Sequence, residues 1–181
     1  MKILGFTGSR ADYYLQKPLF QHLNGDPEVD FRLIVSGNLS TANASVVLSD
    51  IVDNNIHYDL ISCSLGTSHS FQIAEIIIEV EKYLQTYSPD AAIVYADRYE
   101  SFAFALAAFH NDIVIFHLEA GDITQGGTYD DNIRHCITKM SHLHGTSTAR
   151  GLDVLKGLGE EPWRSDPVSY THLRAHETLR Y

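Results

Sequence analysis

Apolar runs and amphipathic stretches alternate along most of this chain. Short apolar runs predict strands, and apolar residues that recur every three to four positions predict helices. The strands are expected at residues 3–7, 31–35, 58–62, 91–96, 113–118 and 143–147. The helices are expected at residues 12–23, 40–52, 71–84 and 102–109, from about residue 132 onward, and at 150–158. Pro18 predicts that the first helix either is kinked or begins near Leu15 with the proline in its first turn.

The alternation also predicts the fold class. Continuous apolar strands separated by helices are typical of a parallel sheet with both faces covered. Right-handed crossovers then give an α/β fold, a Rossmann-like doubly wound parallel sheet. Ligands bind such sheets at the carboxyl ends of the strands. Residues that directly follow a predicted strand are therefore the first candidates for function.

The overall charge of the chain argues against two kinds of binding partner, nucleic acids and anionic membranes. The 181 residues include 13 Lys and Arg against 23 Asp and Glu, a net charge of −10. An acidic surface argues against nucleic acid and against an anionic membrane as the main partner. No apolar run approaches the roughly 20 residues needed to span a bilayer. Cys63 and Cys136 lie far apart without CxxC spacing, which indicates a reduced, cytoplasmic protein with buried thiols.

The end of the chain breaks the alternating pattern. After Asp166 and Pro167 it reads VSYTHLRAHETLRY, which has no clear amphipathic period. Residues 168–178 resemble a translated sequencing-library adapter. We therefore expect one native domain at residues 1–165, followed by a non-native tail at 166–181. The chain would then be an N-terminal fragment of a longer protein.

Two polar turns follow the first and the fourth predicted strands. Gly8, Ser9 and Arg10 follow the first strand, where backbone N–H groups and an arginine favour a phosphate. A tight turn with a surface arginine is the alternative. Asp97 follows the fourth strand and either faces the ligand crevice or caps the next helix, with Glu100 completing a capping box.

The densest group of polar residues follows the fifth strand. Glu119 comes directly after apolar residues, which predicts a raised carboxyl pKa suited to a general acid or base. The alternative is a glutamate that faces solvent in a loop. Asp130 and Asp131 precede Arg134, so one aspartate is expected to cap a helix and Asp130 to pair with Arg134 across one turn. A surface ion pair of little energetic value is the alternative.

Four histidines lie in or near this region, at positions 117, 135, 142 and 144. Their spacing does not match a zinc signature, and no cysteine pair accompanies them. We therefore expect satisfied or partly buried histidines and no metal site.

Four segments together resemble one known family. GSRADY, YADRYESFAFALAA, HLEAGDITQGGTYDDNIRHCITKMSHLH and GLGEEPWR are similar to the UDP-N-acetylglucosamine 2-epimerase family, most of all to its hydrolysing branch. The resemblance extends from Lys2 to about Arg164. It implies the N-terminal half of a two-domain glycosyltransferase-B fold, with a UDP-sugar bound between the domains. It also implies a cytoplasmic homo-oligomer that uses no cofactor and serves sialic-type acid synthesis.

The resemblance also implies a reaction and a set of site residues. The family eliminates UDP to give a 2-acetamidoglucal, to which water adds in the hydrolysing branch and UDP in the other. The matching catalytic carboxylates are Asp97, Glu119, Asp130 and Asp131. The matching substrate-binding arginines are Arg10, Arg98 and Arg134. Which carboxylate acts as acid and which as base stays open.

The chain departs from the family pattern at small positions near the sugar. Ala96 and Ala120 stand where many hydrolysing members have glycine, and Asp122 stands where many have glutamate. These changes leave the substituents of the sugar open, and the chain without a second domain is expected to be inactive. The alternatives are a non-hydrolysing epimerase and a Rossmann-like binding module without chemistry. Only an enzyme needs the carboxylates to converge.

Overall fold

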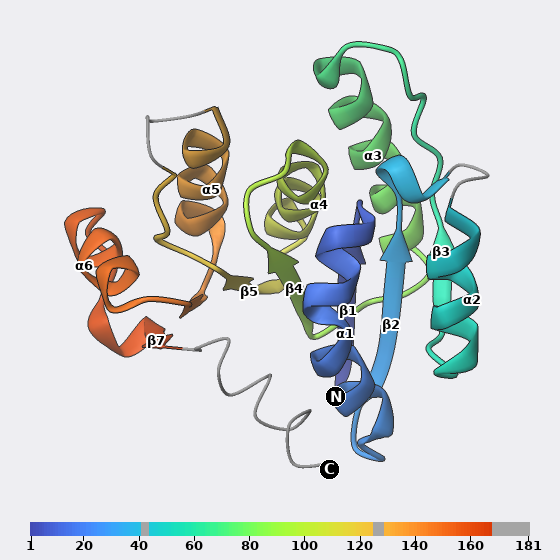
Figure 1. The fold of residues 1–181 in the computed structure, drawn as a ribbon, viewed down its shortest axis with the longest axis horizontal. Coiled ribbons are helices and arrows are strands. Elements are labelled where there is room, and N and C mark those ends of the chain that lie inside the picture. The colour runs from blue at the N-terminus through green and yellow to red at the C-terminus, as the bar shows by residue number, and fades with distance from the viewer. Residues whose placement is uncertain (41–43, 125–128, 168–181) are drawn as a thin grey trace.

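The computed structural model describes residues 1–40, 44–124 and 129–167, where the strands form one parallel sheet (Figure 1). The strands are β1 (Lys2–Thr7), β2 (Asp30–Val35), β3 (Tyr58–Leu60), β4 (Ala91–Tyr95), β5 (Val114–Leu118), β6 (Leu143–Thr146) and β7 (Ser165–Pro167). Their order is β3-β2-β1-β4-β5-β6-β7, and every neighbouring pair is parallel. The predicted doubly wound α/β fold is confirmed, and its topological switch point lies between β1 and β4.

Helices cover both faces of this sheet. They are α1 (Arg10–Gly25), α2 (Ser45–Asp53), α3 (His69–Leu84), α4 (Tyr99–His110), α5 (Tyr129–Met140) and α6 (Ala149–Gly157), with 3₁₀ turns η1 (Gly37–Ser40) and η3 (Pro162–Arg164). One apolar core packs α3, α4 and α5 against the sheet, and the other packs α1 and α2. In Figure 1, α1 crosses in front of the sheet.

Neighbouring side chains along each central strand lie alternately in the two apolar cores. Leu4 of β1 lies in the core under α3 and α4, whereas Ile3 lies in the core under α1 and α2. Val94 and Ile93 of β4 divide in the same way. Because both faces of the central strands are buried, these strands read as continuous apolar runs. Their carboxyl ends all meet at one edge of the sheet, which therefore carries the candidate site.

Several predicted boundaries differ from the structure. Helix α1 begins at Arg10, so Pro18 lies in its interior and the expected start near Leu15 is wrong. Ser9 caps this helix by accepting a hydrogen bond from the Asp12 amide, at 3.2 Å. The helix expected at 40–52 comprises part of η1 and α2, and residues 41–43 lie outside the described residues. Strand β7 was not predicted.

Strand β7 is the last element of the sheet in the described residues. Strand β7 pairs with β6 and includes Asp166 and Pro167, which we had assigned to the tail. Residues 168–181 lie outside the described residues, so the adapter interpretation stays a prediction.

Cys63 is buried, but Cys136 is exposed on α5, so the expectation of two buried thiols is wrong. In the described ranges, no helix combines the length and apolarity needed to cross a membrane.

Candidate active site at the carboxyl edge of the sheet

Strands β4 and β5 are each followed by a non-glycine residue with a left-handed backbone. Ala96 follows β4 with a φ of 57°, and Glu119 follows β5 with a φ of 60°. Such conformations cost of order 1–3 kcal/mol each and persist only where the surroundings enforce them. Here the Ala96 amide donates to the Leu118 carbonyl at 3.0 Å, and the Ala120 amide donates to the Gly145 carbonyl at 3.1 Å. The chain therefore turns sharply at both strand ends.

His117 holds these two turns against α5. Its ring is fully buried between the Ala96 carbonyl, 2.8 Å from Nε2, and the Thr138 hydroxyl, 3.1 Å from Nδ1. A carbonyl only accepts, so Nε2 carries the proton and Nδ1 accepts from the hydroxyl. Burial lowers the His117 pKa to about 3, with the Ala96 hydrogen bond opposing the shift. The ring is thus neutral and structural.

Arg134 of α5 joins the ends of β4 and β5. Its guanidinium donates to the Asp97 carboxylate, to Asp131 Oδ1 at 3.2 Å and to the Asp122 carbonyl at 2.6 Å. Asp131 Oδ1 also accepts from the Thr124 amide at 2.9 Å. That backbone hydrogen bond is the main reason why the Asp131 pKa is lowered. Asp131 is therefore ionised and holds Arg134 in place.

The two carboxyl groups at the strand ends have raised pKa values, in contrast to Asp131. Burial raises the pKa of Asp97, although Arg134 opposes the shift. Burial also raises the pKa of Glu119, against a hydrogen bond from Tyr95, and the predicted direction is confirmed. Each carboxylate lies in the electrostatic field of Arg134, and Asp97 also acts on Glu119. The site therefore combines two carboxyl groups suited to proton transfer with one fixed cation.

Asp122 attaches the loop after β5 to α6. Its carboxylate accepts from the Ser147 hydroxyl at 2.5 Å and from the Thr148 hydroxyl at 3.0 Å. Thr148 in turn caps α6 by accepting from the Gly151 amide at 3.0 Å. A pocket of about 370 Å³ lies beside this contact, and Arg134 and Arg150 are among its lining residues. Asp122 thus fixes the position of the loop that carries Glu119.

A second arginine lies on the other side of the β4–α4 turn. Arg98 donates to Glu100 through Nη2 at 2.7 Å and Nε at 3.2 Å, and its Nε lies 3.6 Å from Asp12 Oδ2. The expected capping box is wrong, because the N-cap of α4 is Arg98, which makes no side-chain capping bond. Asp97 points to Arg134 instead, and Glu100 pairs with Arg98.

The remaining predicted residues lie at the same edge but differ in their surroundings. Arg10 is exposed in the first turn of α1, beside the switch point. Asp130 is exposed in the first turn of α5, whereas Asp131 is buried there and makes the ion pair with Arg134 that we expected of Asp130. Both aspartates lie inside the helix, so the expectation that one of them is its N-cap is wrong. Asp97, Glu119, Asp131 and Arg134 therefore converge, with Asp130 beside Asp97, whereas Arg10 lies on the turn after β1.

The other buried histidine is also structural. Nε2 of His144 lies 3.1 Å from Glu160, whose carboxylate also accepts from Lys139 at 2.5 Å and Arg164 at 3.1 Å. Burial lowers the His144 pKa, with Glu160 opposing the shift. No group of three or more histidine, cysteine or acidic side chains in the described part of the chain is arranged to hold a metal.

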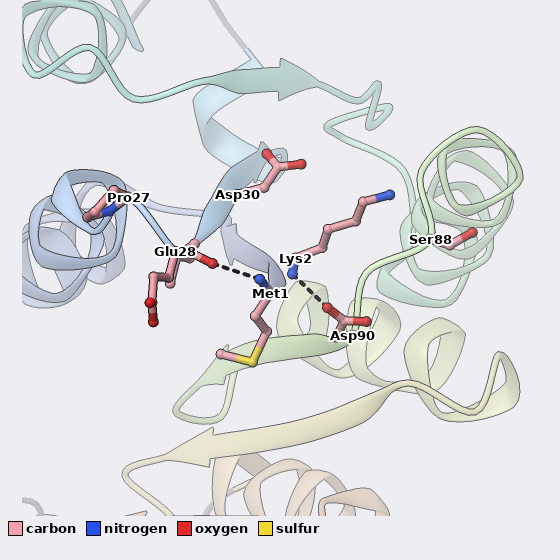
Figure 2. Close-up of a pocket in the computed structure, with 8 residues that line it drawn as sticks. Met1, Lys2, Pro27, Glu28, Asp30, Ser88 and Asp90 are labelled. Atoms are coloured by element: carbon pink, nitrogen blue, oxygen red, sulfur yellow. Dashed lines mark hydrogen bonds between the residues drawn. The ribbon is translucent and has the colours of Figure 1, made fainter.

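A second hollow lies at the opposite, amino edge of the sheet. It has a volume of about 520 Å³, and its walls come from the starts of β1 and β2 and the residues before β4. Figure 2 shows that its polar groups bind one another: the Met1 ammonium donates to the Glu28 carbonyl and the Lys2 amide to Asp90, both at 2.7 Å. These contacts close the ends of neighbouring strands, and the hollow lies far from the candidate site.

Sequence reasoning missed three residues of the candidate site. Glu100 was assigned only to a capping box, Asp122 only to a departure from the family pattern, and Asp12 to no role. The signal for Glu100 was present in YADRYE, where a glutamate follows an arginine by two positions. Asp122 and Asp12 gave no comparable signal, because their partners are distant in sequence or on another element.

Comparison with known proteins gives one consistent result. The family model described as UDP-N-acetylglucosamine 2-epimerase matches residues 21–165. The polysialic acid biosynthesis protein P7 of Escherichia coli is 34% identical over 166 residues, which cover 89% of this chain and 42% of that protein. The UDP-N,N'-diacetylbacillosamine 2-epimerase (hydrolyzing) of Legionella pneumophila is 29% identical, over 88% of this chain and 43% of that protein.

A solved structure agrees in fold. The UDP-GlcNAc 2-epimerase of Neisseria meningitidis, in a crystal structure bound to UDP-GlcNAc, matches with a TM-score of 0.84 at 18% identity. The match covers 99% of this chain and 51% of that one. The chain spans less than half the length of the curated relatives named above. On the evidence of the family match over residues 21–165, the chain belongs to the UDP-N-acetylglucosamine 2-epimerase family.

Proposed function

We propose that this chain is the N-terminal domain of a hydrolysing UDP-N-acetylglucosamine 2-epimerase that releases an N-acetylmannosamine-type sugar in the cytoplasm. One observation carries the proposal. Asp97 and Glu119 follow adjacent strands, have raised pKa values, and share the field of one fixed arginine. Epimerisation at C2 needs carboxyl groups whose pKa values lie nearer to neutral than usual.

The proposed reaction begins with loss of UDP from the sugar. One of the two strand-end carboxylates removes the proton at C2, while the bond from C1 to the diphosphate oxygen breaks and a 2-acetamidoglucal forms. Water then adds across the double bond, with the second carboxylate taking part in the proton transfer. Arg134 stabilises the carboxylates in their positions, and Arg10 and Arg98 lie on the side proposed for the diphosphate.

The hydrolysing outcome rests on the relatives. Two curated relatives, from Legionella and Campylobacter, are named as hydrolysing 2-epimerases and are 29% and 30% identical to this chain. The sialic-type pathway is supported by the polysialic acid protein P7. A homo-oligomeric full-length protein and catalytic roles of Asp130 and Asp131 are part of the same proposal, which leaves the substituents of the sugar open.

The deciding experiment follows UDP-N-acetylglucosamine turnover by the full-length protein by NMR in deuterated water. Free N-acetylmannosamine with deuterium at C2 supports the proposal, and UDP-N-acetylmannosamine supports the non-hydrolysing alternative. Glu119→Gln and Asp97→Asn should each lower turnover at least about 100-fold. Asp153→Asn, an exposed change on α6, is the matched control and should keep full activity. Glu119→Gln with wild-type turnover would remove Glu119 from the mechanism.

A further inference from the structure

Glu100 is a carboxylate with no exposed surface in the first turn of α4. Both of its oxygens bind the same guanidinium, Oε1 accepting from Arg98 Nη2 at 2.7 Å and Oε2 from Nε at 3.2 Å. The two parallel hydrogen bonds fix the plane of the guanidinium as well as its position. Arg98 itself keeps about a third of its side chain exposed, with a relative accessibility of 32%. Glu100 is thus the buried support of a partly exposed arginine.

The side chain of Glu100 packs against the backbone of two turns. A Cβ placed on Gly8, in the turn after β1, would lie 3.2 Å from Cβ of Glu100. A Cβ placed on Gly37, after β2, would lie 2.9 Å from Oε1 of Glu100 and 2.8 Å from the Gly8 carbonyl. Gly37 also has a φ of 58°, which favours glycine. Glu100 therefore lies where the ends of β1, β2 and β4 meet, next to the switch point.

A second carboxylate completes the arrangement from α1. Asp12 Oδ2 lies 3.6 Å from Arg98 Nε, so the guanidinium is held between two acids. Asp12 belongs to the helix turn that begins with Arg10. Asp12 therefore connects the Arg98–Glu100 pair to the first turn of α1, which carries Arg10.

Stability alone does not account for this pair. Replacing a buried ion pair by apolar residues of similar volume is often neutral or stabilising, because desolvation offsets the attraction. We propose that Glu100 is a positioning residue that fixes Arg98 and the Gly8 and Gly37 turns, and so preorganises the side of the crevice that takes a nucleoside diphosphate. The ligand class rests on the proposed function, whereas the fixing of the turns does not.

The experiment compares Glu100→Gln with Glu160→Gln. Glu160 is also a buried carboxylate with cationic partners, but it lies next to β6 and α6, away from the switch point. Both variants should lower the melting temperature. Only Glu100→Gln should accelerate amide hydrogen exchange in residues 8–10 and 37–38 and weaken UDP binding to the full-length protein, by about tenfold.

A double-variant cycle tests whether Glu100 acts through Arg98. In an Arg98→Gln background, Glu100→Gln should weaken UDP binding by less than about twofold. Arg98→Lys keeps the charge but loses the paired hydrogen bonds, so it should accelerate exchange in the same turns even if Glu100→Gln does not fold. The inference would be overturned if Glu100→Gln and Arg98→Lys kept the wild-type rate of amide hydrogen exchange in residues 8–10 and 37–38. It would also be overturned if Glu100→Gln lowered UDP affinity equally in the wild-type and Arg98→Gln backgrounds. A wild-type protein that binds no UDP would refute the proposed function, and the exchange data would still decide the role of Glu100.

Discussion

His117 should make the stability of this domain depend on pH between about 3 and 6.5. The unfolded chain binds a proton on this histidine below a pKa of about 6.5. The folded chain binds it only below a pKa of about 3, because the ring is buried. Between the two values the unfolded state holds more protons, so stability is fully present above pH 6.5 and is lost as the pH falls.

The size of the effect follows from the shift. Each pH unit in this window removes about 1.4 kcal/mol, so lowering the pH from 7 to 5 should cost about 2 kcal/mol of unfolding free energy. Asp97 and Glu119 act in the opposite direction, because their raised pKa values let the folded state retain protons. The total pH dependence therefore mixes several groups, and a variant is needed to isolate His117.

Urea denaturation of the wild type and of His117→Gln at pH 7 and pH 5 isolates the contribution of His117 to the pH dependence of stability. The glutamine amide can still donate to the Ala96 carbonyl but does not titrate. The destabilisation caused by the substitution should be about 2 kcal/mol smaller at pH 5 than at pH 7. Ile115→Val, a buried change on the same strand, should cost the same at both pH values. Equal costs for His117→Gln at the two pH values would show that His117 takes up a proton in the folded state and would contradict its lowered pKa.

Three further outcomes are expected. In the full-length enzyme, the acidic limb of the pH profile of kcat/KM should have an apparent pKa above that of an ordinary glutamate, because burial raises the pKa of Glu119. The Glu119→Asp variant should keep an acidic limb but with a different apparent pKa. An unchanged limb in that variant would assign the limb to another group. Arg134→Ala leaves two buried or half-buried carboxylates unpaired and should cost about 3–5 kcal/mol in urea unfolding, so a loss below 1 kcal/mol would contradict the network. Gly121→Ala would place a Cβ 2.4 Å from the Gly151 carbonyl oxygen at a residue with a φ of 77°, and should lower the free energy of unfolding by at least about 2 kcal/mol in thermal melts. Gly157→Ala is the control, because its Cβ would meet nothing within 4 Å, and should be neutral or stabilising in the same melts.

The sequence predicted the sheet well because its central strands are buried on both faces. Such strands appear as continuous apolar runs, and residues that follow them, such as Glu119, can be located directly. Strand β7 could not be found in this way, since Ser165–Pro167 contains no apolar run and joins the sheet through its backbone. Local pattern reading therefore succeeds where burial dictates composition and fails at the edge of the sheet.

The ion pairs were harder to predict than the strands. Asp97 looked like a helix cap because Glu100 follows it by three positions, yet its partner Arg134 lies 37 residues further along the chain. The choice of Asp130 over Asp131 as the partner of Arg134 was also wrong. Asp131 lies three residues before Arg134 inside α5, and the Thr124 amide holds its carboxylate toward the arginine. These partners become neighbours only when β4, β5 and α5 assemble.

The two arginine networks bear on what this chain can bind by itself. Neighbouring residues of one turn point to opposite sides, so Asp97 joins the network of Arg134 and Arg98 joins that of Glu100 and Asp12. Counting the other residues of the site as well, this edge holds seven carboxylates, of Asp12, Asp97, Glu100, Glu119, Asp122, Asp130 and Asp131, against four arginines, Arg10, Arg98, Arg134 and Arg150. Two of the arginines are already paired with acids, which leaves little positive charge for a diphosphate. If the proposed substrate is correct, most of the charge that neutralises it must come from outside this chain. Under the proposed function, the 181-residue chain should therefore bind UDP weakly and the full-length protein should bind it strongly.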